Sequence, residues 1–411
     1  MAGMPPPSSA RYAWVIVGTG TLTIFACLGL GRFALGMLLP SMAAGLSLSY
    51  AECGSIGTAN FLGYLAAVVA AGPIAARLGA RRLVVLALLI IAASMLLVSR
   101  AASFPAVVAL YAVTGFGSGA ANVPMMGLIA RWFDGSGRGR AAGFASIGSG
   151  FAIIASGALI PWVNGRYGED GWRTNWALLS VAVGVIAAVA ALLLRDPPAS
   201  PARLVPAGAP APPPAPPRLA MARSRPVWLL GLAYALFGYT YAIYVTFIVT
   251  SLVRERGFSE VEAGRFWSWV GLLSLLSGPV FGAFSDRRGR RAGLMTVFLV
   301  QMIAYLFAAG DLPRLFLHLS IGLFGVAAWS IPTIMIAAIT DQVGQERALG
   351  AFGFITFFFG LGQVAGPAVA GLLAERSGSF ASSFLMAAAF AAAAILVSAL
   401  LPRPASASAA R

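Results

Sequence analysis

Residues 72–82 read GPIAARLGARR, and residues 282–291 read GAFSDRRGRR. Each stretch lies between two long apolar segments, and the second follows the first after about half the length of the chain. A similar short stretch at the same place in both halves of a chain is the mark of an internal repeat. The sequence therefore predicts one structural unit written twice.

The composition places this chain in a lipid bilayer. Hydrophobic residues make up 59% of it and charged residues 10%, whereas a soluble globular protein carries about 25% charged residues. One His and two Cys leave no material for a metal site or a disulfide framework, and we expect no cofactor. The apolar run behind the polar first residues is too long for a removable signal peptide, so we interpret it as the first membrane span.

Twelve apolar segments are long enough to cross a bilayer, which takes about 20 mostly apolar residues. They are Ala13–Leu39, Ala51–Ala71, Leu83–Ser99, Phe104–Ala130, Ala141–Val163, Asn175–Leu194, Val227–Leu252, Val261–Phe284, Ala292–Ala309, Leu315–Ile339, Ala348–Leu373 and Phe380–Leu401. The predicted fold is an all-α integral membrane protein of two six-helix bundles, related by a pseudo-two-fold axis around a central cavity.

The predicted organisation has five parts. A short N-terminus (residues 1–12) precedes the N-terminal bundle (13–194). A Pro- and Ala-rich segment (195–226), typical of a semi-rigid linker, leads to the C-terminal bundle (227–402) and a short C-terminus (403–411). Duplicated bundles of this kind are typical of secondary transporters, in which one half rocks against the other.

The net charge of +15 follows the predicted topology. All 28 basic residues are arginines, concentrated in the termini, the linker and the loops on the same side of the membrane. Because cytoplasmic loops carry an excess of Lys and Arg, we place both termini in the cytoplasm and the spans in the inner membrane of a bacterial cell. The charge therefore implies no nucleic-acid partner.

The twelve spans, the central linker and the doubled loop resemble the major facilitator superfamily over nearly the whole chain. The superfamily pattern G-x-x-x-D-R-x-G-R-R is complete in the second loop, at Gly282, Asp286, Arg287, Gly289, Arg290 and Arg291. The first loop has Ala76 in place of the Asp but keeps Gly72, Arg77, Gly79 and Arg81. The resemblance implies alternating-access transport by a monomer, with these loops as a cytoplasmic latch between the halves. With Ala76, the first latch is expected to be weaker or built from another acid, such as Asp134.

Further stretches narrow the resemblance. Residues 131–152 and 171–173 resemble monocarboxylate and oxalate/formate carriers, and residues 31–33 resemble a branch of bacterial carriers. In monocarboxylate carriers a cation in the first span is linked to the anionic substrate, and Arg32 resembles that position. Those carriers also have an Asp and an Arg in the eighth span, which residues 267–277 here lack. The resemblance therefore leaves the substrate and the coupling ion open.

Arg32 is the one charged residue well inside a predicted span. An Arg at the bilayer centre costs about 2.5–3.5 kcal/mol even on insertion-based scales. Such a side chain either faces a cavity with a partner or bends toward the headgroups. Gly29 and Gly36 leave space on the same helix face, and no acid lies inside a span, so we predict that Arg32 binds a substrate anion. The alternatives are snorkelling and hydrogen bonding to backbone carbonyls.

Other polar and aromatic residues are predicted at a similar depth. The further candidates for substrate binding are Asn60, Tyr64, Asn122, Tyr239, Trp329 and Gln363. Asn60 and Tyr64 stand four residues apart and so share a helix face. The alternative is that each Asn or Gln only holds two helices together, at about 0.6 kcal/mol.

The sequence thus predicts a secondary transporter that moves a small organic anion, with a monocarboxylate as the first candidate. A proton relay needs Asp, Glu or His inside the membrane, and no acid lies well inside a predicted span. Proton-linked symport, anion exchange and facilitated passage therefore all stay open. One alternative is an efflux porter for drugs or metabolites. A membrane sensor or enzyme is a remote alternative, because the sequence has no catalytic cluster, metal spacing or nucleotide motif. The expected partners are the small-molecule substrate, protons and the bilayer.

Overall fold

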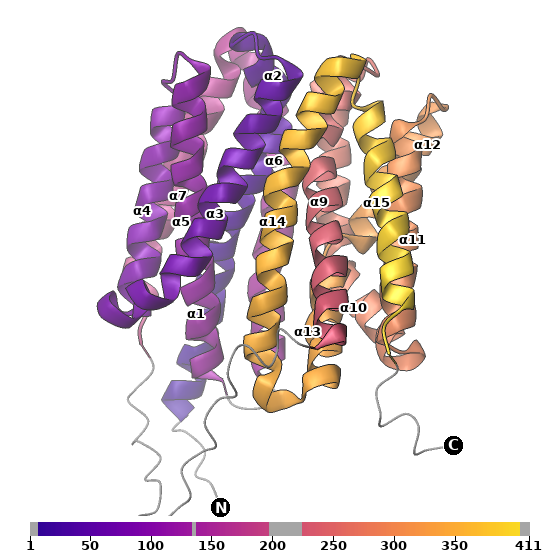
Figure 1. Ribbon diagram of the computed structural model, residues 1–411. Coiled ribbons are helices and arrows are strands. Elements are labelled where there is room, and N and C mark those ends of the chain that lie inside the picture. Colours follow the sequence, from indigo (N-terminus) through magenta and orange to yellow (C-terminus); the bar gives the residue numbers. More distant parts are fainter. Residues whose placement is uncertain (1–6, 134–136, 197–223, 403–411) are drawn as a thin grey trace, which may run out of the picture.

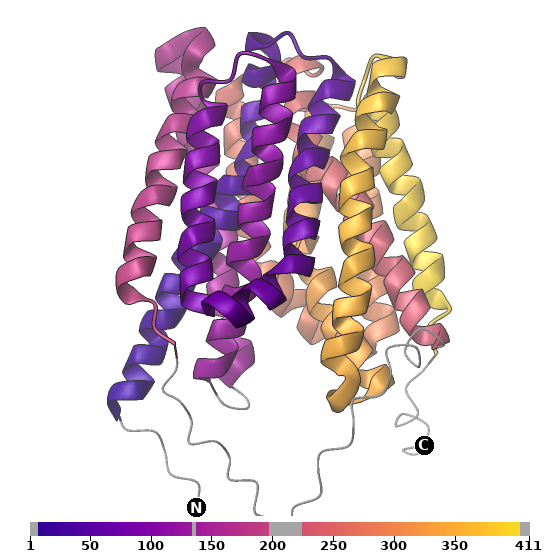
Figure 2. The ribbon, with the colours of Figure 1, turned by 60° about the vertical axis from the view of Figure 1, so that its left-hand side comes forward.

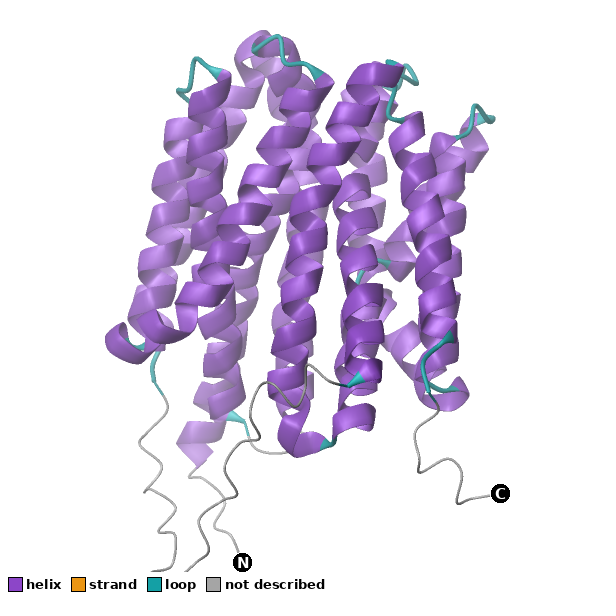
Figure 3. Ribbon diagram, in the orientation of Figure 1, coloured by secondary structure: helices purple, strands orange, loops and turns teal. Residues whose placement is uncertain are grey.

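The structure is a computed structural model that describes residues 7–133, 137–196 and 224–402. Within these ranges every regular element is a helix (Figures 1 and 3). The N-terminal half contains α1 (Pro7–Ile24), η1 (Phe25–Phe33), α2 (Ala34–Gly45), α3 (Tyr50–Leu78), α4 (Ala80–Val98), α5 (Phe104–Trp132), α6 (Gly137–Tyr167), η2 (Gly168–Asp170) and α7 (Gly171–Leu193). The C-terminal half contains α9 (Arg225–Arg254), α10 (Glu260–Arg288), α11 (Arg290–Ala309), α12 (Arg314–Ala327), α13 (Ser330–Val343), α14 (Gln345–Ser377) and α15 (Ala381–Ala399).

Eleven stretches of helix in the described ranges are long and apolar enough to cross a membrane. The longest, Gly137–Leu193, is a hairpin in which α7 folds back on α6. The turn η2 separates the two helices, and Asn175 Nδ2 of α7 donates to the carbonyl oxygen of Ile160 in α6 at 3.2 Å. Counted as two spans, this hairpin brings the total to the predicted twelve. The predicted all-α fold is confirmed.

Several helices extend beyond the apolar segments that predicted them. The helix of the first span begins at Pro7, before Ala13, and α14 runs from Gln345 to Ser377. Hydropathy marks only the apolar core of a span, and the polar turns at each end continue the same helix. Of the predicted linker, residues 197–223 lie outside the described residues, and so does Asp134, the alternative latch acid.

The internal repeat is visible in how two corresponding helices begin and end. Ser49 before α3 and Ser259 before α10 each form a capping box with the Glu three residues later, which satisfies free backbone N–H groups at the helix start. The same helices end at Gly79 and Gly289, with φ of +83° and +90°. Side chains other than Gly rarely adopt this backbone conformation. This explains why both copies of the loop keep a Gly at that place.

The two halves lie side by side (Figure 2). We call the end at which α1 begins and α15 ends the terminal end, which is the lower end in Figure 1, and the opposite one the far end. The main contacts between the halves join α3 to α14, α6 to α10 and α2 to α9. These contacts involve the far-end parts of the helices, and we call them the far-end seam.

Backbone meets backbone in the far-end seam. A Cβ atom built on Gly371 of α14 would lie 2.7 Å from the carbonyl oxygen of Tyr50 in α3. A Cβ built on Gly264 of α10 would come closer than 3.0 Å to the carbonyl oxygen of Gly157 in α6. Real Cβ contacts are longer than that, so only Gly fits these places in this conformation.

Two hydrogen bonds accompany these glycine contacts, one on each side of the seam. Asn164 Nδ2 of α6 donates to Glu260 Oε2 of α10 at 2.7 Å. The backbone N–H of Ala51, in the first turn of α3, donates to Glu375 Oε2 of α14 at 3.2 Å. A carboxylate near a helix N-terminus is favoured by the helix dipole. The seam is therefore closed by tight packing and by charge-assisted hydrogen bonds.

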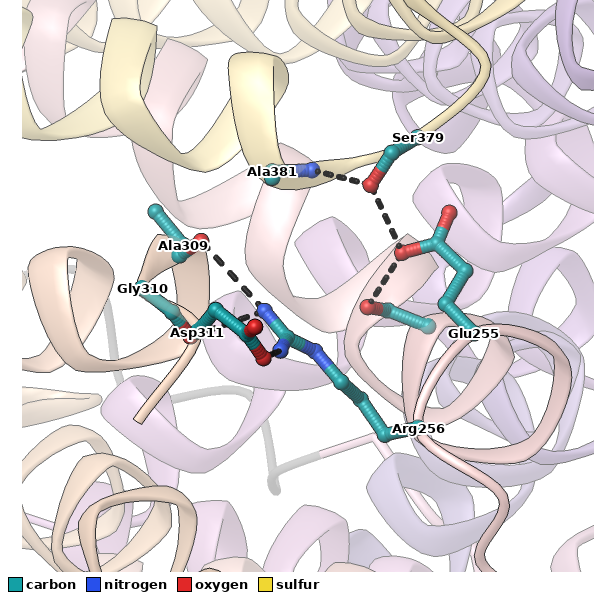
Figure 4. Close-up of polar contacts among 8 residues, drawn as sticks. Glu255, Arg256, Ala309, Gly310, Asp311, Ser379 and Ala381 are labelled. Atoms are coloured by element: carbon teal, nitrogen blue, oxygen red, sulfur yellow. Dashed lines mark hydrogen bonds and ion pairs between the residues drawn. The ribbon is translucent and has the colours of Figure 1, made fainter. Parts of the chain in front are cut away.

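Charged side chains also hold the far end of each half together. In the C-terminal half, Glu255 accepts a 2.8 Å bond from the backbone N–H of Phe380, just before α15. Arg256 donates a 2.8 Å bond to the carbonyl oxygen of Gly310, just after α11 (Figure 4). In the N-terminal half, Arg173 makes the corresponding 2.6 Å bond to a carbonyl oxygen just after α4. Cations at helix C-termini and anions at N-termini stabilise both ends. Residues 171–173, which resemble monocarboxylate carriers, thus include an Arg that holds helices together at the far end of the N-terminal half.

Candidate functional site

Arg32 lies in an unusual part of the first span. Residues Phe25–Phe33 form a π-helical segment, in which the N–H of Ala34 bonds to the carbonyl oxygen of Gly29, five residues back. Gly29 and Gly31 disfavour a regular α-helix here, and α6 packs closely against Gly29 at Ala152. Such π-helical turns are rare and occur frequently at functional sites.

The Arg32 side chain is buried between the halves. It is 8% exposed, and its guanidinium carbon lies 4.3 Å from the ring centroids of both Phe61 and Tyr64 in α3. Nη2 donates to Gln363 Oε1 of α14, in the other half, at 3.5 Å. Because the side chain ends among rings and an amide inside the bundle, the snorkelling alternative is wrong for this structure.

No carboxylate accompanies the Arg32 charge in the part of the chain that the structure describes. The ion pairs found there lie at the helix ends, and none includes Arg32. Within the same ranges, Arg32 Nε also has no hydrogen-bond partner. A buried donor without an acceptor costs about 1–3 kcal/mol, and more when it is charged. Cation–π contacts offset part of this cost, and the guanidinium charge stays without a counter-ion in the described ranges.

Two side chains contact the backbone around Arg32. Tyr111 of α5 donates its hydroxyl to the carbonyl oxygen of Arg32 at 3.0 Å. Asn60 of α3 donates its Nδ2 to the carbonyl oxygens of Gly31 and Tyr111, both at 3.3 Å. The structure therefore places Asn60 beside Arg32, with its amide donor used by the backbone rather than free for a substrate.

Tyr64 and Asn122 form a second layer at the site. Asn122 Nδ2 of α5 donates to the Tyr64 hydroxyl at 2.7 Å. Both residues are partly exposed, whereas Arg32 behind the Tyr64 ring is buried. The hydrogen bond between Asn122 and Tyr64 thus fixes the Tyr64 ring, which is one of the two rings that cover the Arg32 guanidinium.

Trp329 lies at a break in the tenth span. Pro332 crowds the carbonyl oxygen four residues earlier and weakens the helix there, and the span is divided between α12 and α13 at that place. Ser277 Oγ of α10 accepts the N–H of Trp329 at 2.9 Å. The indole ring lies 5.3 Å from both Phe33 and Tyr241, centroid to centroid. Tyr241 and Trp329 of this aromatic cluster belong to the C-terminal half, and Phe33 is the residue next to Arg32 in the N-terminal half.

Tyr239 does not join this group, although the sequence placed it there. Its hydroxyl points to Met386 Sδ at 3.4 Å, and its ring lies 4.8 Å from Phe390, both in α15. The residue faces a neighbouring helix of its own half, so we leave it out of the site. A depth estimate from sequence does not tell which side of a helix faces the centre.

The cavity beside Arg32 is small in this conformation. Its volume is about 10 Å³, and Asn60, Phe61, Tyr111 and Thr246 are among its lining residues. That is about the space that one water molecule needs. An organic solute can reach Arg32 only after the covering side chains or the two halves move apart. The described residues contain no group of three His, Cys, Asp or Glu that could hold a metal ion.

The repeated loops sit at the terminal end, away from Arg32. Arg290 forms ion pairs with Asp286 and, at 2.9 Å, with Asp341 of α13, all in one half. Arg81 donates to the carbonyl oxygen of Ala191 in α7 at 2.7 Å, in the other half. Each of these contacts stays within a half, so none of them is a latch between halves in this conformation.

The first loop copy is built differently from the second. Ala76 stands where Asp286 does, and Ala80 stands where Arg290 does. Both line a cavity of about 590 Å³, together with Arg131 and Asp196 at 3.7 Å from each other. The alanines remove the ion pair that the second copy has, which leaves open space at the corresponding place.

Sequence reasoning missed three residues near Arg32: Phe33, Phe61 and Tyr111. Phe61 follows Asn60 directly in the sequence, and this position beside a predicted site residue was a signal that could have identified it. Tyr111 had none, because it contacts Arg32 through a backbone oxygen of another helix.

Comparisons with known proteins agree with this architecture. The family model described as "Uncharacterised MFS-type transporter YbfB" matches residues 24–399. The "Hexuronate transporter" of Bacillus subtilis (strain 168) is 22% identical over 380 residues, which cover 87% of this chain and 87% of that protein. "Solute carrier family 67 member A1" of Homo sapiens is 34% identical over 135 residues, so that this chain spans only 32% of that protein's length. A solved structure described as "Crystal structure of nucleoside transporter NupG" has a TM-score of 0.73 at 15% identity and covers 95% of this chain and 99% of that one.

Proposed function

This chain belongs to the transporter family whose model is described as "Uncharacterised MFS-type transporter YbfB". From that premise we propose that it moves a small organic anion across the membrane by alternating access. As a member of this family it is a membrane-embedded secondary transporter of small solutes, not an enzyme. The anion and its coupling are the proposal. A monocarboxylate is the first candidate for the substrate.

The observation that carries the proposal is the position of Arg32. Its guanidinium is buried at the junction of the halves, with Phe61 and Tyr64 on one side and Gln363 on the other. In the described ranges it has no carboxylate partner. A charge kept inside a membrane without a counter-ion is the expected arrangement when the substrate supplies that counter-ion.

The relatives support an anion in general terms. The Bacillus subtilis relative is a hexuronate transporter by name, and a hexuronate is a sugar carrying one carboxylate. We propose the same charged group for the substrate here, because a carboxylate can accept two hydrogen bonds from a guanidinium. With no acid near Arg32 among the described residues, coupling by proton-linked symport would use the substrate's own proton, and anion exchange would need none.

We also propose an orientation in the membrane. Arginines are concentrated in the loops of the terminal end, as in residues 287–291, and this excess is typical of the cytoplasmic side. The terminal end would then face the cytoplasm and the far end the outside. Because the far-end seam is closed, the conformation described here would be inward-facing, in the inner membrane of a bacterium and as a monomer.

The decisive experiment measures uptake of radiolabelled monocarboxylates into proteoliposomes that contain the purified chain. Arg32→Gln is expected to abolish uptake at unchanged protein yield, and Arg32→Lys to keep part of it, because a point charge lacks the planar fork of Arg. Gln342→Ala, a change of a half-buried residue at the terminal end, serves as the control. Undiminished uptake by Arg32→Gln would refute the anion role.

A second candidate is an efflux porter for apolar compounds. The aromatic cluster of Phe33, Tyr241 and Trp329 favours it, because such rings bind apolar solutes without a charge. In that case Trp329→Ala would lower resistance to the exported compound in cells, and Arg32→Gln would not.

A further inference from the structure

We propose that Tyr111 is a positioning residue that fixes the direction of the Arg32 side chain; this rests on the proposed function, since Arg32 is its anion site. Tyr111 is 1% exposed, and its hydroxyl donates to the carbonyl oxygen of Arg32 itself at 3.0 Å. The contact is therefore made to the backbone from which the guanidinium projects. It comes from α5, a different helix of the same half.

The backbone at this place needs an external constraint. Around Arg32 the chain is π-helical, with the Ala34 N–H bonded five residues back to Gly29. A π-helical turn is rare beside the α-helical alternative. A change of one residue in the helical register rotates the following side chains by about 100°. Whatever stabilises the π-helical turn therefore also decides whether Arg32 points between the halves or elsewhere.

Asn60 completes the constraint. Its Nδ2 donates to the carbonyl oxygen of Gly31, the residue before Arg32, and to that of Tyr111, both at 3.3 Å. Three segments, α3, α5 and η1, are thus joined at two successive carbonyls of the π-helical segment. In the described ranges these bonds use the amide donor of Asn60 and the hydroxyl hydrogen of Tyr111, so neither residue has a donor left for a substrate.

The consequence for Arg32 is specific. The guanidinium reaches Gln363 of the other half at 3.5 Å while it lies against the rings of Phe61 and Tyr64. A shift of its backbone would remove all three contacts at once. A hydrogen bond that only held α5 against the first span would change stability and leave the exposure of Arg32 as it is. The two possibilities therefore differ in a measurable quantity.

The test follows the modification of Arg32 by phenylglyoxal, an arginine reagent, in the purified full-length chain, quantified for the Arg32 peptide by mass spectrometry. Tyr111→Phe removes only the hydroxyl. It is expected to speed up the modification of Arg32 by about 3- to 10-fold, which corresponds to the loss of one net hydrogen bond. The matched control is Trp176→Phe, because the Trp176 ring packs 5.6 Å from the Tyr111 ring. This control is expected to lower the melting temperature and to leave the Arg32 rate as in the wild type.

A wild-type Arg32 rate in Tyr111→Phe would overturn the proposal. If that variant does not fold, Asn60→Leu, which removes the second tether with little change of volume, gives the same decision. Combined in one chain, the two changes are expected to speed up modification by less than the product of their separate effects, since they belong to one network. Uptake by Arg32→Gln is measured separately. Retained uptake there refutes the anion site, whereas a changed Arg32 rate in Tyr111→Phe would still show that Tyr111 positions Arg32.

Discussion

Replacing Gly264 with Ala is expected to open the far-end seam. The added Cβ would come closer than 3.0 Å to the carbonyl oxygen of Gly157 in the other half, and 2.7 Å from the ring of Pro161. Neither neighbour can swing away, because one is backbone and the other a ring tied to the backbone. The clash exists only while α6 and α10 are in contact, so it disfavours the closed seam and not the open one.

The size of the effect follows from packing energies. Overfilling a tight contact costs about 1–3 kcal/mol, and here this cost falls on one conformation only. Ala is also about 1 kcal/mol better than Gly inside a helix, but that gain applies to both conformations and cancels in their ratio. A difference of about 1–3 kcal/mol changes the ratio of the closed to the open seam by about 5- to 150-fold.

Cys53 provides the assay. It is 0% exposed and lies on α3, next to the other side of the seam, where Ala51 bonds to Glu375. In purified protein that carries Cys27→Ala, so that Cys53 is the remaining thiol, the rate of maleimide labelling reports seam opening. Because Gly264 lies in the α6–α10 contact and Cys53 beside the α3–α14 contact, faster labelling would require both sides to open together.

The matched control is Gly278→Ala on the same helix. There the closest atom to an added Cβ is 3.7 Å away, in ordinary van der Waals contact. Faster labelling of Cys53 in Gly264→Ala, with the Gly278→Ala rate unchanged, is the expected result. Equal rates in the two variants would refute the reasoning, because the clash would then have been absorbed without separating the halves.

Three further predictions concern the second loop at the terminal end, the break in the tenth span and the far end of the C-terminal half. The double change Asp286→Asn with Arg290→Ala removes ion pairs that lie within the C-terminal half, and because exposed ion pairs contribute about 0–1 kcal/mol each, we expect a small loss in unfolding free energy and an unchanged labelling rate of Cys53; a changed rate would show that this loop also controls the balance between conformations. Ser277→Ala leaves the buried N–H at the helix break without its acceptor, and we expect a loss of about 1–3 kcal/mol in unfolding free energy, against almost none for Ser146→Ala on an exposed surface. Arg256→Ala removes a cation from the C-terminal end of α11, and we expect a melting temperature lower by about 1 °C, for about 1 kcal/mol; the same melting temperature as wild type would show that water replaces it.

Hydropathy and the doubled loop predicted the twelve spans, because a span needs a long apolar run whatever it contacts. The helix ends were missed by several residues, as at Pro7, because capping and dipole effects extend helices past their apolar part. Within the site, Arg32 stood out since a charge in hydrocarbon is costly. Tyr239 and Tyr111 could not be told apart by depth, because their use depends on which face of a helix meets which neighbour.

The tenth span differs from its counterpart in the N-terminal half in a way that the repeat conceals. Pro124 in α5 and Pro332 lie at corresponding places, yet α5 is continuous while the tenth span is divided into α12 and α13. A continuous helix behaves as a stiff rod, and a divided one as two rods with a joint. Because Asp341 of α13 forms an ion pair with Arg290 at the start of α11, bending at the break would move α13 and that end of α11 separately from α12. The C-terminal half would then bend within its tenth span, at a place where α5 keeps the N-terminal half straight.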